Sequence, residues 1–380
     1  MFGALYGDVI GSYYEVHCTK EYDFPLMAES TFTDDSVLIA AVCKTILNAP
    51  SEIGRFGIRG RSRQFAAQYR QYFSYFPNAG FGQMFSVWAR DYTSKTNHSY
   101  ANGAAMRVMP IAWAYKDFDQ MMRQVKASCL PTHNNLEAIK GAQAVAAAIR
   151  LALDGQSKDE IKKYIEKNYY NLSTPLSSIR ANHVFDSRAS YSVPPAIIAF
   201  LESNDYESAI RNAVSLGGDA DTQACIAGGI AEAFYREIPE HIREFCDKRI
   251  DITIKKTVRE FEDRFSKEKT IRPFPSWEET VQLMYDKGLD SFAHEVIRVL
   301  YSKDKSRRYV VYRIRNNLLQ YRLERLFQFD EDEWKYYLCR DNNALPGYWC
   351  EDGGKNVSVF NTMDDLLKEF QSDPEYQQYF

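Results

Sequence analysis

Two short acidic motifs, almost two hundred residues apart, hold the side chains best suited to chemistry in this sequence. Each motif unites two carboxylates with a threonine hydroxyl. The residues are Thr33, Asp34 and Asp35 in the segment FTDDS, and Asp219, Asp221 and Thr222 in the segment GGDADT. Oxygen ligands of this kind suit hard cations such as Mg²⁺, Mn²⁺ or Ca²⁺, and the lack of a nearby His or Cys argues against zinc or copper. The motifs therefore predict a site for divalent cations.

The expected number of cations follows from the charge that the two motifs would bring together. If folding makes the motifs neighbours, four carboxylates share one small volume, where their repulsion is severe unless cations offset it. Two metal ions about 3.5–4 Å apart are the usual solution. The alternative is purely structural, because a hydroxyl or carboxylate at a helix start also caps free backbone N–H groups. One Asp is enough for a cap, and each motif has two.

The elements that must position these motifs are helices. Residues 1–262 read as helix after helix, joined by loops rich in Gly, Pro, Asn and Asp, and apolar residues at steps of three and four predict a helix over 139–153. The first motif precedes the apolar run 37–47. The second precedes 222–235, whose small side chains permit close helix contact, and the glycines at 217–218 should end the helix before it. Both motifs are thus expected at loop-to-helix junctions.

Two further helix starts are predicted from local sequence. Pro194 and Pro195 are expected to open one helix, since proline is favoured in a first turn. Asn204 with Glu207 resembles a capping box that starts the next.

The chain is predicted to be mainly α, with an all-α catalytic domain over 1–262 and a smaller C-terminal α+β module over 277–380. The segment RFSKEKTIRPFPSW at 263–276 breaks the helical pattern with two prolines and mixed charge, which is typical of a linker. Within the module, two helices are expected around Gly288, and a last helix over 361–370.

The module is also expected to contain a small sheet. The segments that read as strands are YVVYRIR, LQYRLERLFQF, WKYYLCR and NVSVF. The turn-forming EDGG at 351–354 suggests a hairpin. Aromatic residues are abundant here, and we expect them to build the core of the sheet rather than an interface.

Composition narrows the class of protein. With 380 residues, 45% apolar and 14% aromatic, the chain can bury a large core. A net charge of −4 gives no global attraction to nucleic acid or anionic lipid, so neither is expected as the main partner. The seven cysteines are scattered without a CxxC pair, which favours a reducing, cytoplasmic compartment. No basic leader and no long apolar run is seen, so secretion and membrane insertion are not expected.

Five segments of the chain carry a family resemblance. In order they are GALYGDVIGSYYE from Gly3, FTDDS, SYANGAAMRVMPI from Ser99, THNNLEAIKGAQAVAAAI from Thr132, and SLGGDADTQACIAGGIAEAFY from Ser215. Together they resemble the ADP-ribosylglycohydrolase family, which includes the ADP-ribosylarginine and ADP-ribosylserine hydrolases and the dinitrogenase reductase activating enzyme. The order and number of the segments make a chance match improbable.

The resemblance implies a fold, a cofactor and a set of site residues. It implies an all-α bundle with a dinuclear Mg²⁺ or Mn²⁺ centre, to which the six motif residues map as ligands. Glu15 falls where the family has a mobile acidic residue beside the metals. The positions that match substrate-lining residues of the family are Ser99, Tyr100, Asn102, Gly103 and His133. The expected reaction is hydrolysis of the glycosidic bond between ADP-ribose and an acceptor such as a protein Arg or Ser side chain.

Some positions depart from the family pattern. Ala101 stands where Gly is usual, and Ser36 replaces a frequent Thr while keeping a hydroxyl. Tyr14 and Asn135 stand where Pro is common, so both loops are expected to differ in shape, which bears on substrate choice. Every position that would ligate metal is retained, which favours an intact enzyme.

The mechanism expected from the resemblance passes through an oxocarbenium-like state at the anomeric carbon of the ribose. Such a reaction needs a positioned water and a grip on the ribose hydroxyls, and bound cations can provide both. Glu15, Asp34 and Asp35 are the candidate bases for that water, and the sequence does not choose among them.

Each substrate-site residue also has an ordinary structural interpretation. Glu15 alone is typical of a surface carboxylate, and His133 before a helix is typical of a satisfied polar residue. Tyr100 could pack as an ordinary aromatic residue, and the Asn-Gly pair at 102–103 could simply form a turn. The arginine-rich stretch at 55–63 is more typical of a solvated surface than of a phosphate clamp.

Two other functions compete with this hypothesis. One is a non-catalytic ADP-ribose-binding or structural protein, against which the intact ligand set argues. The other is a hydrolase of a different ADP-ribose conjugate, including modified nucleic acid, which motif spacing alone does not separate from a protein substrate.

Overall fold

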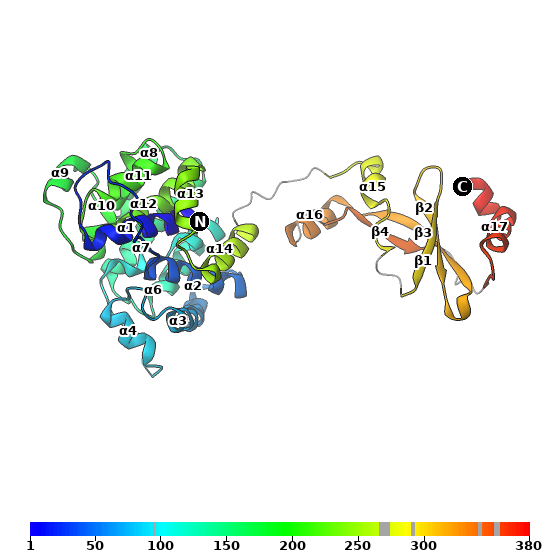
Figure 1. The fold of residues 1–380 in the computed structure, drawn as a ribbon, viewed down its shortest axis with the longest axis horizontal. Coiled ribbons are helices and arrows are strands. Elements are labelled where there is room, and N and C mark those ends of the chain that lie inside the picture. The colour runs from blue at the N-terminus through cyan, green and yellow to red at the C-terminus, as the bar shows by residue number, and fades with distance from the viewer. Residues whose placement is uncertain (94–95, 266–273, 290–292, 341–343, 353–357) are drawn as a thin grey trace. The chain divides into compact units, whose positions relative to one another are not determined.

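The computed structural model of the protein describes residues 1–93, 96–265, 274–289, 293–340, 344–352 and 358–380. The chain divides into two compact units, Met1–Lys267 and Glu268–Phe380. Figure 1 draws the helices and strands of both units. The mainly α fold class predicted above is confirmed, with a small antiparallel sheet near the C-terminus.

The first unit is built from helices, and its described residues contain no β-strand. In chain order the helices are α1 (Phe2–Val16), α2 (Asp34–Asn48), η1 (Arg55–Gly57), α3 (Ile58–Tyr75), α4 (Gln83–Arg90), η2 (Asn102–Ala104), α5 (Met109–Ala114), α6 (Phe118–Cys129), α7 (Leu136–Leu153), α8 (Lys158–Asn168), α9 (Leu176–Asn182), α10 (Ala189–Leu201), α11 (Tyr206–Val214), α12 (Ala220–Tyr235), α13 (Glu240–Asp247) and α14 (Ile252–Phe265). The helix predicted over 139–153 is confirmed as α7. The expected central helix over 222–235 is confirmed as α12, which is almost entirely buried.

Helices α1 and α12 lie in backbone contact along a stripe of small residues. On α1 the stripe is Gly3, Gly7 and Gly11, spaced four residues apart on one helix face. A Cβ atom added to Gly7 would lie 2.1 Å from the carbonyl oxygen of Ala224, and one on Gly11 would lie 2.5 Å from the Cα of Asp221. Only glycine therefore permits this approach, which sets α1 directly beside the start of α12.

Two predicted helix starts need correction. Pro194 and Pro195 do not open a helix, because α10 already begins at Ala189 and holds both prolines in its interior. The Ser192 hydroxyl lies within donor distance of the carbonyl oxygens of Asp186 and Arg188 and so ties the first turn of α10 to the segment before it. Helix α11 is capped one residue later than expected, by Asp205, whose partner in the capping box is Ser208.

The second unit is a four-stranded antiparallel sheet in the order β1-β2-β3-β4, with short helices. Its elements are α15 (Trp277–Met284), β1 (Glu295–Tyr301), β2 (Arg307–Arg313), η4 (Arg315–Asn317), β3 (Leu319–Gln328), α16 (Glu331–Arg340), β4 (Gly347–Glu351), α17 (Met363–Ser372) and α18 (Pro374–Tyr379). Leu366 and Phe370 of α17 pack against Tyr309 and Leu319 of the sheet, beside which α17 is drawn in Figure 1. The aromatic residues of this unit thus build a core, as expected.

Several elements of the second unit differ from expectation. WKYYLCR belongs to helix α16 and not to a strand, because Asp330 and Glu333 exchange hydrogen bonds in a capping box that starts a helix. The second helix expected after Gly288 is instead strand β1, which is rich in β-branched residues. The helix expected over 361–370 is confirmed as α17. Gly353 and Gly354 of the expected hairpin, with Asn356 and Val357 of the NVSVF segment, lie outside the described residues.

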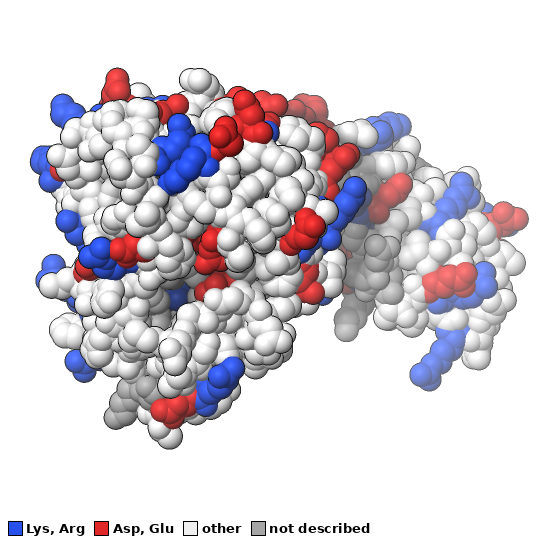
Figure 2. Space-filling model, turned by 60° about the vertical axis from the view of Figure 1, so that its left-hand side comes forward, with Lys and Arg blue, Asp and Glu red and all other residues white. Residues whose placement is uncertain are grey.

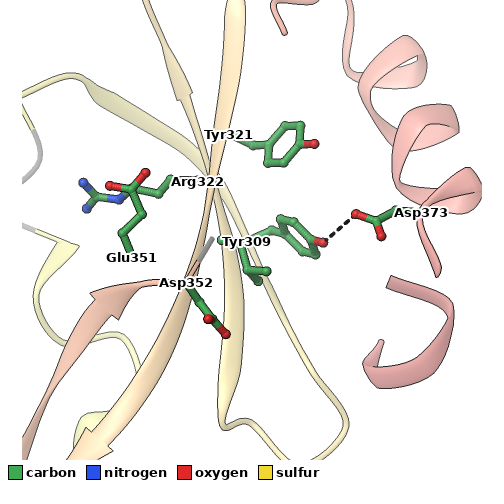
Figure 3. Close-up of a pocket in the computed structure, with 7 residues that line it drawn as sticks. Tyr309, Tyr321, Arg322, Glu351, Asp352 and Asp373 are labelled. Atoms are coloured by element: carbon green, nitrogen blue, oxygen red, sulfur yellow. Dashed lines mark hydrogen bonds between the residues drawn. The ribbon is translucent and has the colours of Figure 1, made fainter. Parts of the chain in front are cut away.

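A small cavity of about 260 Å³ lies beside strand β3 in this unit (Figure 3). Its wall includes Tyr309, whose hydroxyl donates to Asp373 at 3.2 Å, and Arg322, which pairs with Glu324 at 2.5 Å. Both contacts are made within the unit itself.

Two further features concern the chain as a whole. The linker predicted at 263–276 stays a prediction, because residues 266–273 lie outside the described part of the chain, and helix α14 runs on to Phe265. None of the helices among the described residues combines the length and the apolar character that crossing a bilayer requires.

Candidate metal centre and cleft

The contact between α1 and α12 places carboxylates of both helices in one volume. Asp8 and Glu15 are seven residues apart, so they lie on the same face of α1. Oxygens of Asp8, Asp35 and Asp221 lie within 4.8 Å of one another. A second group with the same spacing is formed by Glu15, Asp219 and Asp221. The two groups share Asp221, as expected of a carboxylate between two cations.

Asp8 fixes the start of α2 against α1. Its carboxylate accepts hydrogen bonds from the backbone N–H of Thr33 at 3.0 Å and of Ser36 at 3.1 Å, and from both side-chain hydroxyls. The Thr33 oxygen also caps α2 by accepting from the N–H of Asp35. The structural reading of the first motif is therefore correct for Thr33, while Asp34 and Asp35 remain available to a ligand.

The start of α12 is held by a tight corner. Gly217 and Gly218 both adopt positive φ angles, +68° and +74°, which favour glycine. The Gln223 side chain donates to the carbonyl oxygens of Gly217 and Asp219, and Asn102 donates to the Asp219 carboxylate at 2.7 Å. Asn102 of η2 thus holds the Asp219 carboxylate at a corner that Gln223 of α12 fixes, and the motifs at 32–36 and 217–222 meet in the folded unit.

The side chains at this meeting point fit hard cations. Asp35 is 1% exposed, and its Oδ1 atom has no hydrogen-bond partner among the described residues. Its Oδ2 atom accepts from the Thr222 hydroxyl at 3.3 Å. A buried carboxylate oxygen without a donor is costly unless a cation contacts it. Carboxylate and hydroxyl oxygens are the donor set that Mg²⁺ and Mn²⁺ prefer.

The crowding of acids changes their protonation. Burial, followed by the charges of Asp8 and Asp219, raises the pKa of Asp34 to about 8. Burial and neighbouring carboxylates raise the pKa of Asp35 and of Asp221 well above the ordinary value. Burial likewise raises the pKa of Glu15, to which the charge of Asp219 adds. The shifts have burial as their first cause and mutual repulsion as their second, and bound cations would offset the repulsion.

The metal-free protein is expected to lose stability as the pH rises. An Asp carboxyl has an ordinary pKa of 3.8, whereas the pKa of folded Asp34 is about 8. Between these values the folded state binds more protons than the unfolded state, so the free energy of unfolding falls from about pH 4 to about pH 8. Added Mg²⁺ or Mn²⁺ should therefore stabilise the protein more at pH 8 than at pH 5. Thermal unfolding with EDTA and with each ion checks this, and equal stabilisation at both pH values would contradict it.

The carboxylates lie on the wall of a cleft of about 400 Å³. Figure 2 shows Asp and Glu side chains, in red, along a hollow in the surface of the first unit. Of the residues predicted from the sequence, those that line the cleft are Glu15, Thr33, Asp34, Asp35, Ser99, Asn102, Gly103, His133, Asp219, Asp221 and Thr222. The structure does not place Tyr100 in the cleft wall, and this side chain is 54% exposed. A ligand contact of Tyr100 stays a prediction.

The departures from the family pattern are accommodated locally. Ala101 has a φ of −71°, which any residue adopts, so alanine causes no strain there. Asn135 caps helix α7 by accepting from the N–H of Glu137. Tyr14 is buried and its hydroxyl donates to the Pro25 carbonyl, and Ser36 binds Asp8. These residues therefore have structural partners of their own.

Some site residues were missed in the sequence. Asp8, a buried member of the first three-carboxylate group, could have been found from its seven-residue spacing to Glu15, which puts both on one helix face. Arg107 and Phe185 line the cleft, and no local signal marks either of them. In the arginine-rich stretch, Arg61 is buried and donates to the carbonyl oxygens of Ala49 and Ser51, so it closes the end of α2 instead of binding a phosphate.

Known proteins resemble this chain over its first unit. A family model described as ADP-ribosylglycohydrolase matches residues 1–271. Human ADP-ribosylhydrolase ARH3 is 26% identical over 324 residues, covering 64% of this chain and 87% of that protein. ADP-ribosylarginine hydrolase Tri1 of Pseudomonas putida (strain GB-1) is 26% identical over 165 residues, covering 39% of this chain and 41% of that protein. A solved structure described as an ADP-ribosylglycohydrolase-related protein complex is 20% identical and covers 68% of this chain and 93% of its own, with a TM-score of 0.47. Because the family model spans more than half of the sequence and includes both acidic motifs, this chain belongs to the ADP-ribosylglycohydrolase family.

Proposed function

We propose that the protein is a dinuclear Mg²⁺- or Mn²⁺-dependent hydrolase that removes ADP-ribose from a modified acceptor, such as an Arg or Ser side chain of a protein. The observation that carries this proposal is the pair of three-carboxylate groups that share Asp221 beside a cleft. The names of relatives support the substrate class, since ARH3 and Tri1 are described as ADP-ribosylhydrolases.

The residues that would hold the cations are the six of the two motifs, with Glu15 beside them. Asp35 is enclosed, and Asp221 belongs to both carboxylate groups, so these two would bind most directly. Cations bound there would supply positive charge that activates a water and grips the ribose hydroxyls. Asp8 belongs to the first three-carboxylate group and also accepts several hydrogen bonds from the start of α2, so it positions that helix start beside the cations.

The remaining roles fall to side chains around the cleft. Asp35 is engaged by Thr222 and nearly inaccessible, whereas Glu15 and Asp34 are partly exposed. Glu15 and Asp34 are therefore favoured over Asp35 for taking the proton of the attacking water. Ser99, Gly103 and His133 line the wall across which ADP-ribose would lie.

The decisive experiment compares acceptors. The protein would be incubated with arginine-linked, serine-linked and nucleic-acid-linked ADP-ribose, each with Mg²⁺, with Mn²⁺ and with EDTA, and released ADP-ribose measured. Cation-dependent release from at least one protein conjugate is expected. Release from the nucleic-acid conjugate alone would show that the substrate is modified nucleic acid and not a modified protein. Tight binding of ADP-ribose without any release would indicate a binding protein.

The cysteines bear on the cellular compartment. The cysteine side chains that the structure describes are all unpaired, and most of them are buried. Free thiols fit a reducing compartment, so we propose a cytoplasmic location.

A further inference from the structure

A buried arginine in the cleft wall has no counter-ion in the part of the chain that the structure describes. Arg107 is 0% exposed and no described carboxylate pairs with it. Its Nε and Nη1 atoms lack hydrogen-bond partners among the described residues. The guanidinium stacks 4.2 Å above the ring of Tyr69, which partly offsets its charge. Burying such a charge is energetically costly. The contacts of the third guanidinium nitrogen therefore indicate what role Arg107 has.

The remaining nitrogen, Nη2, is the first donor of a short hydrogen-bond chain that runs from Arg107 through Thr132 to His133. It donates to the Thr132 hydroxyl oxygen at 2.7 Å and to the Ser128 carbonyl at 3.3 Å. Thr132 Oγ1 in turn lies 2.8 Å from His133 Nδ1. Arginine has no acceptor, so the Thr132 oxygen accepts from Arg107, and the acceptor that the described residues offer to its hydroxyl proton is His133 Nδ1.

An imidazole that accepts at Nδ1 carries its proton at Nε2. A neutral histidine has one donor and one acceptor nitrogen, and the bond at one nitrogen decides the other. Protonation at both nitrogens is disfavoured here, because burial and the charge of Arg107 hold the pKa of His133 well below its ordinary value. The ring is therefore a neutral donor.

The donor nitrogen lies at the cleft. A Cβ atom added to Gly103 would lie 3.1 Å from His133 Nε2, so the ring edge rests on this glycine, and both residues line the cleft. None of the described residues accepts a hydrogen bond from Nε2. The Nε2–H group is thus available to an oxygen of a bound ligand.

We propose that Arg107 is a positioning residue that acts through the Thr132 hydroxyl to hold His133 as a neutral Nε2–H donor toward an oxygen of the bound ligand. That the ligand is ADP-ribose rests on the function proposed above, whereas the tautomer of His133 does not. In this arrangement His133 recognises an acceptor oxygen and is not a general acid or base.

The tautomer is tested directly in the free protein. We would record ¹⁵N spectra of histidine-labelled wild-type protein and assign the His133 signals by their loss in His133→Gln. The expected result is an unprotonated Nδ1 and a protonated Nε2 from pH 8 down to pH 5.5. A protonated Nδ1, or titration to an imidazolium within this range, would overturn the proposal without involving any substrate.

A matched pair of variants then tests the role of the hydroxyl. Thr132→Ser keeps the hydroxyl and should retain the wild-type spectrum and affinity. Thr132→Val keeps the shape but removes the proton donor, so the two tautomers should mix and ADP-ribose, with Mn²⁺ present, should bind up to about tenfold more weakly. Equal affinity of the two variants would overturn the role in recognition. If wild-type protein binds no ADP-ribose, the proposed function fails, and the spectra still decide the tautomer.

Discussion

Asp221→Asn is expected to abolish divalent-cation binding and turnover together. The substitution keeps the shape of the side chain but removes the carboxylate that both three-carboxylate groups share. Substitutions that only disturb the support of metal ligands cost about 10–100-fold, so loss of this carboxylate should lower activity by at least about a hundredfold. Isothermal titration with Mn²⁺ and release of ADP-ribose from a conjugate measure the two effects.

A stability measurement separates this effect from misfolding. Metal-free Asp221→Asn should be at least as stable as metal-free wild type, because Asn is neutral at every pH and removes one acid from the buried, mutually repelling cluster. Asp23→Asn is the matched control, since Asp23 is exposed and lies outside the cleft wall, and it should leave affinity and activity unchanged. Normal turnover of Asp221→Asn in EDTA would refute the metal-dependent mechanism.

Gly7→Ala is expected to have the largest effect on stability. The added methyl group would lie 2.1 Å from the Ala224 carbonyl oxygen and 2.5 Å from its carbonyl carbon, which are backbone atoms of a buried helix. The two helices must move apart, so we expect a loss of about 3 kcal/mol in the free energy of unfolding. Cation affinity should fall as well, because Asp8 and Glu15 would move away from Asp221. Chemical unfolding and Mn²⁺ titration test both effects.

The control for Gly7 is another helical glycine. Gly60 lies in α3, and a Cβ atom added there meets nothing within 4 Å. Gly60→Ala should therefore stabilise the protein by about 0.5–1 kcal/mol, as expected for alanine in a helix. If Gly7→Ala were as stable as Gly60→Ala, backbone contact between α1 and α12 would not be what holds these helices together.

Local patterns predicted the helical part of the fold well. The period of apolar residues in α7 and the small residues of α12 each indicated a helix that the structure contains. Local patterns failed where tertiary or capping interactions decide the type of secondary structure or the residue at which a helix begins. The aromatic WKYYLCR segment reads as a strand, but the reciprocal bonds of Asp330 and Glu333 start a helix there. Pro194 and Pro195 likewise lie inside α10, whose start is fixed by residues upstream.

The candidate site was predictable only in part. The residue types of the two acidic motifs predict a site for hard cations. Whether the two motifs lie close together in space depends on the packing of α1 against α12. Arg107 could not have been recognised, because its significance lies in contacts with Tyr69 and Thr132, which are distant in the chain. Roles that arise from long-range contacts leave no mark in local spacing.

The pairing of α1 with α12 also has a consequence for how the protein is made. Helix α1 leaves the ribosome early, whereas its partner is complete only when Tyr235 has been added. Until then the glycine stripe of α1 cannot pack against α12, and the cation ligands of the two motifs remain apart. Contacts between such distant segments form late and slowly. Metal loading is therefore expected to follow synthesis of most of the first unit rather than to guide its early folding.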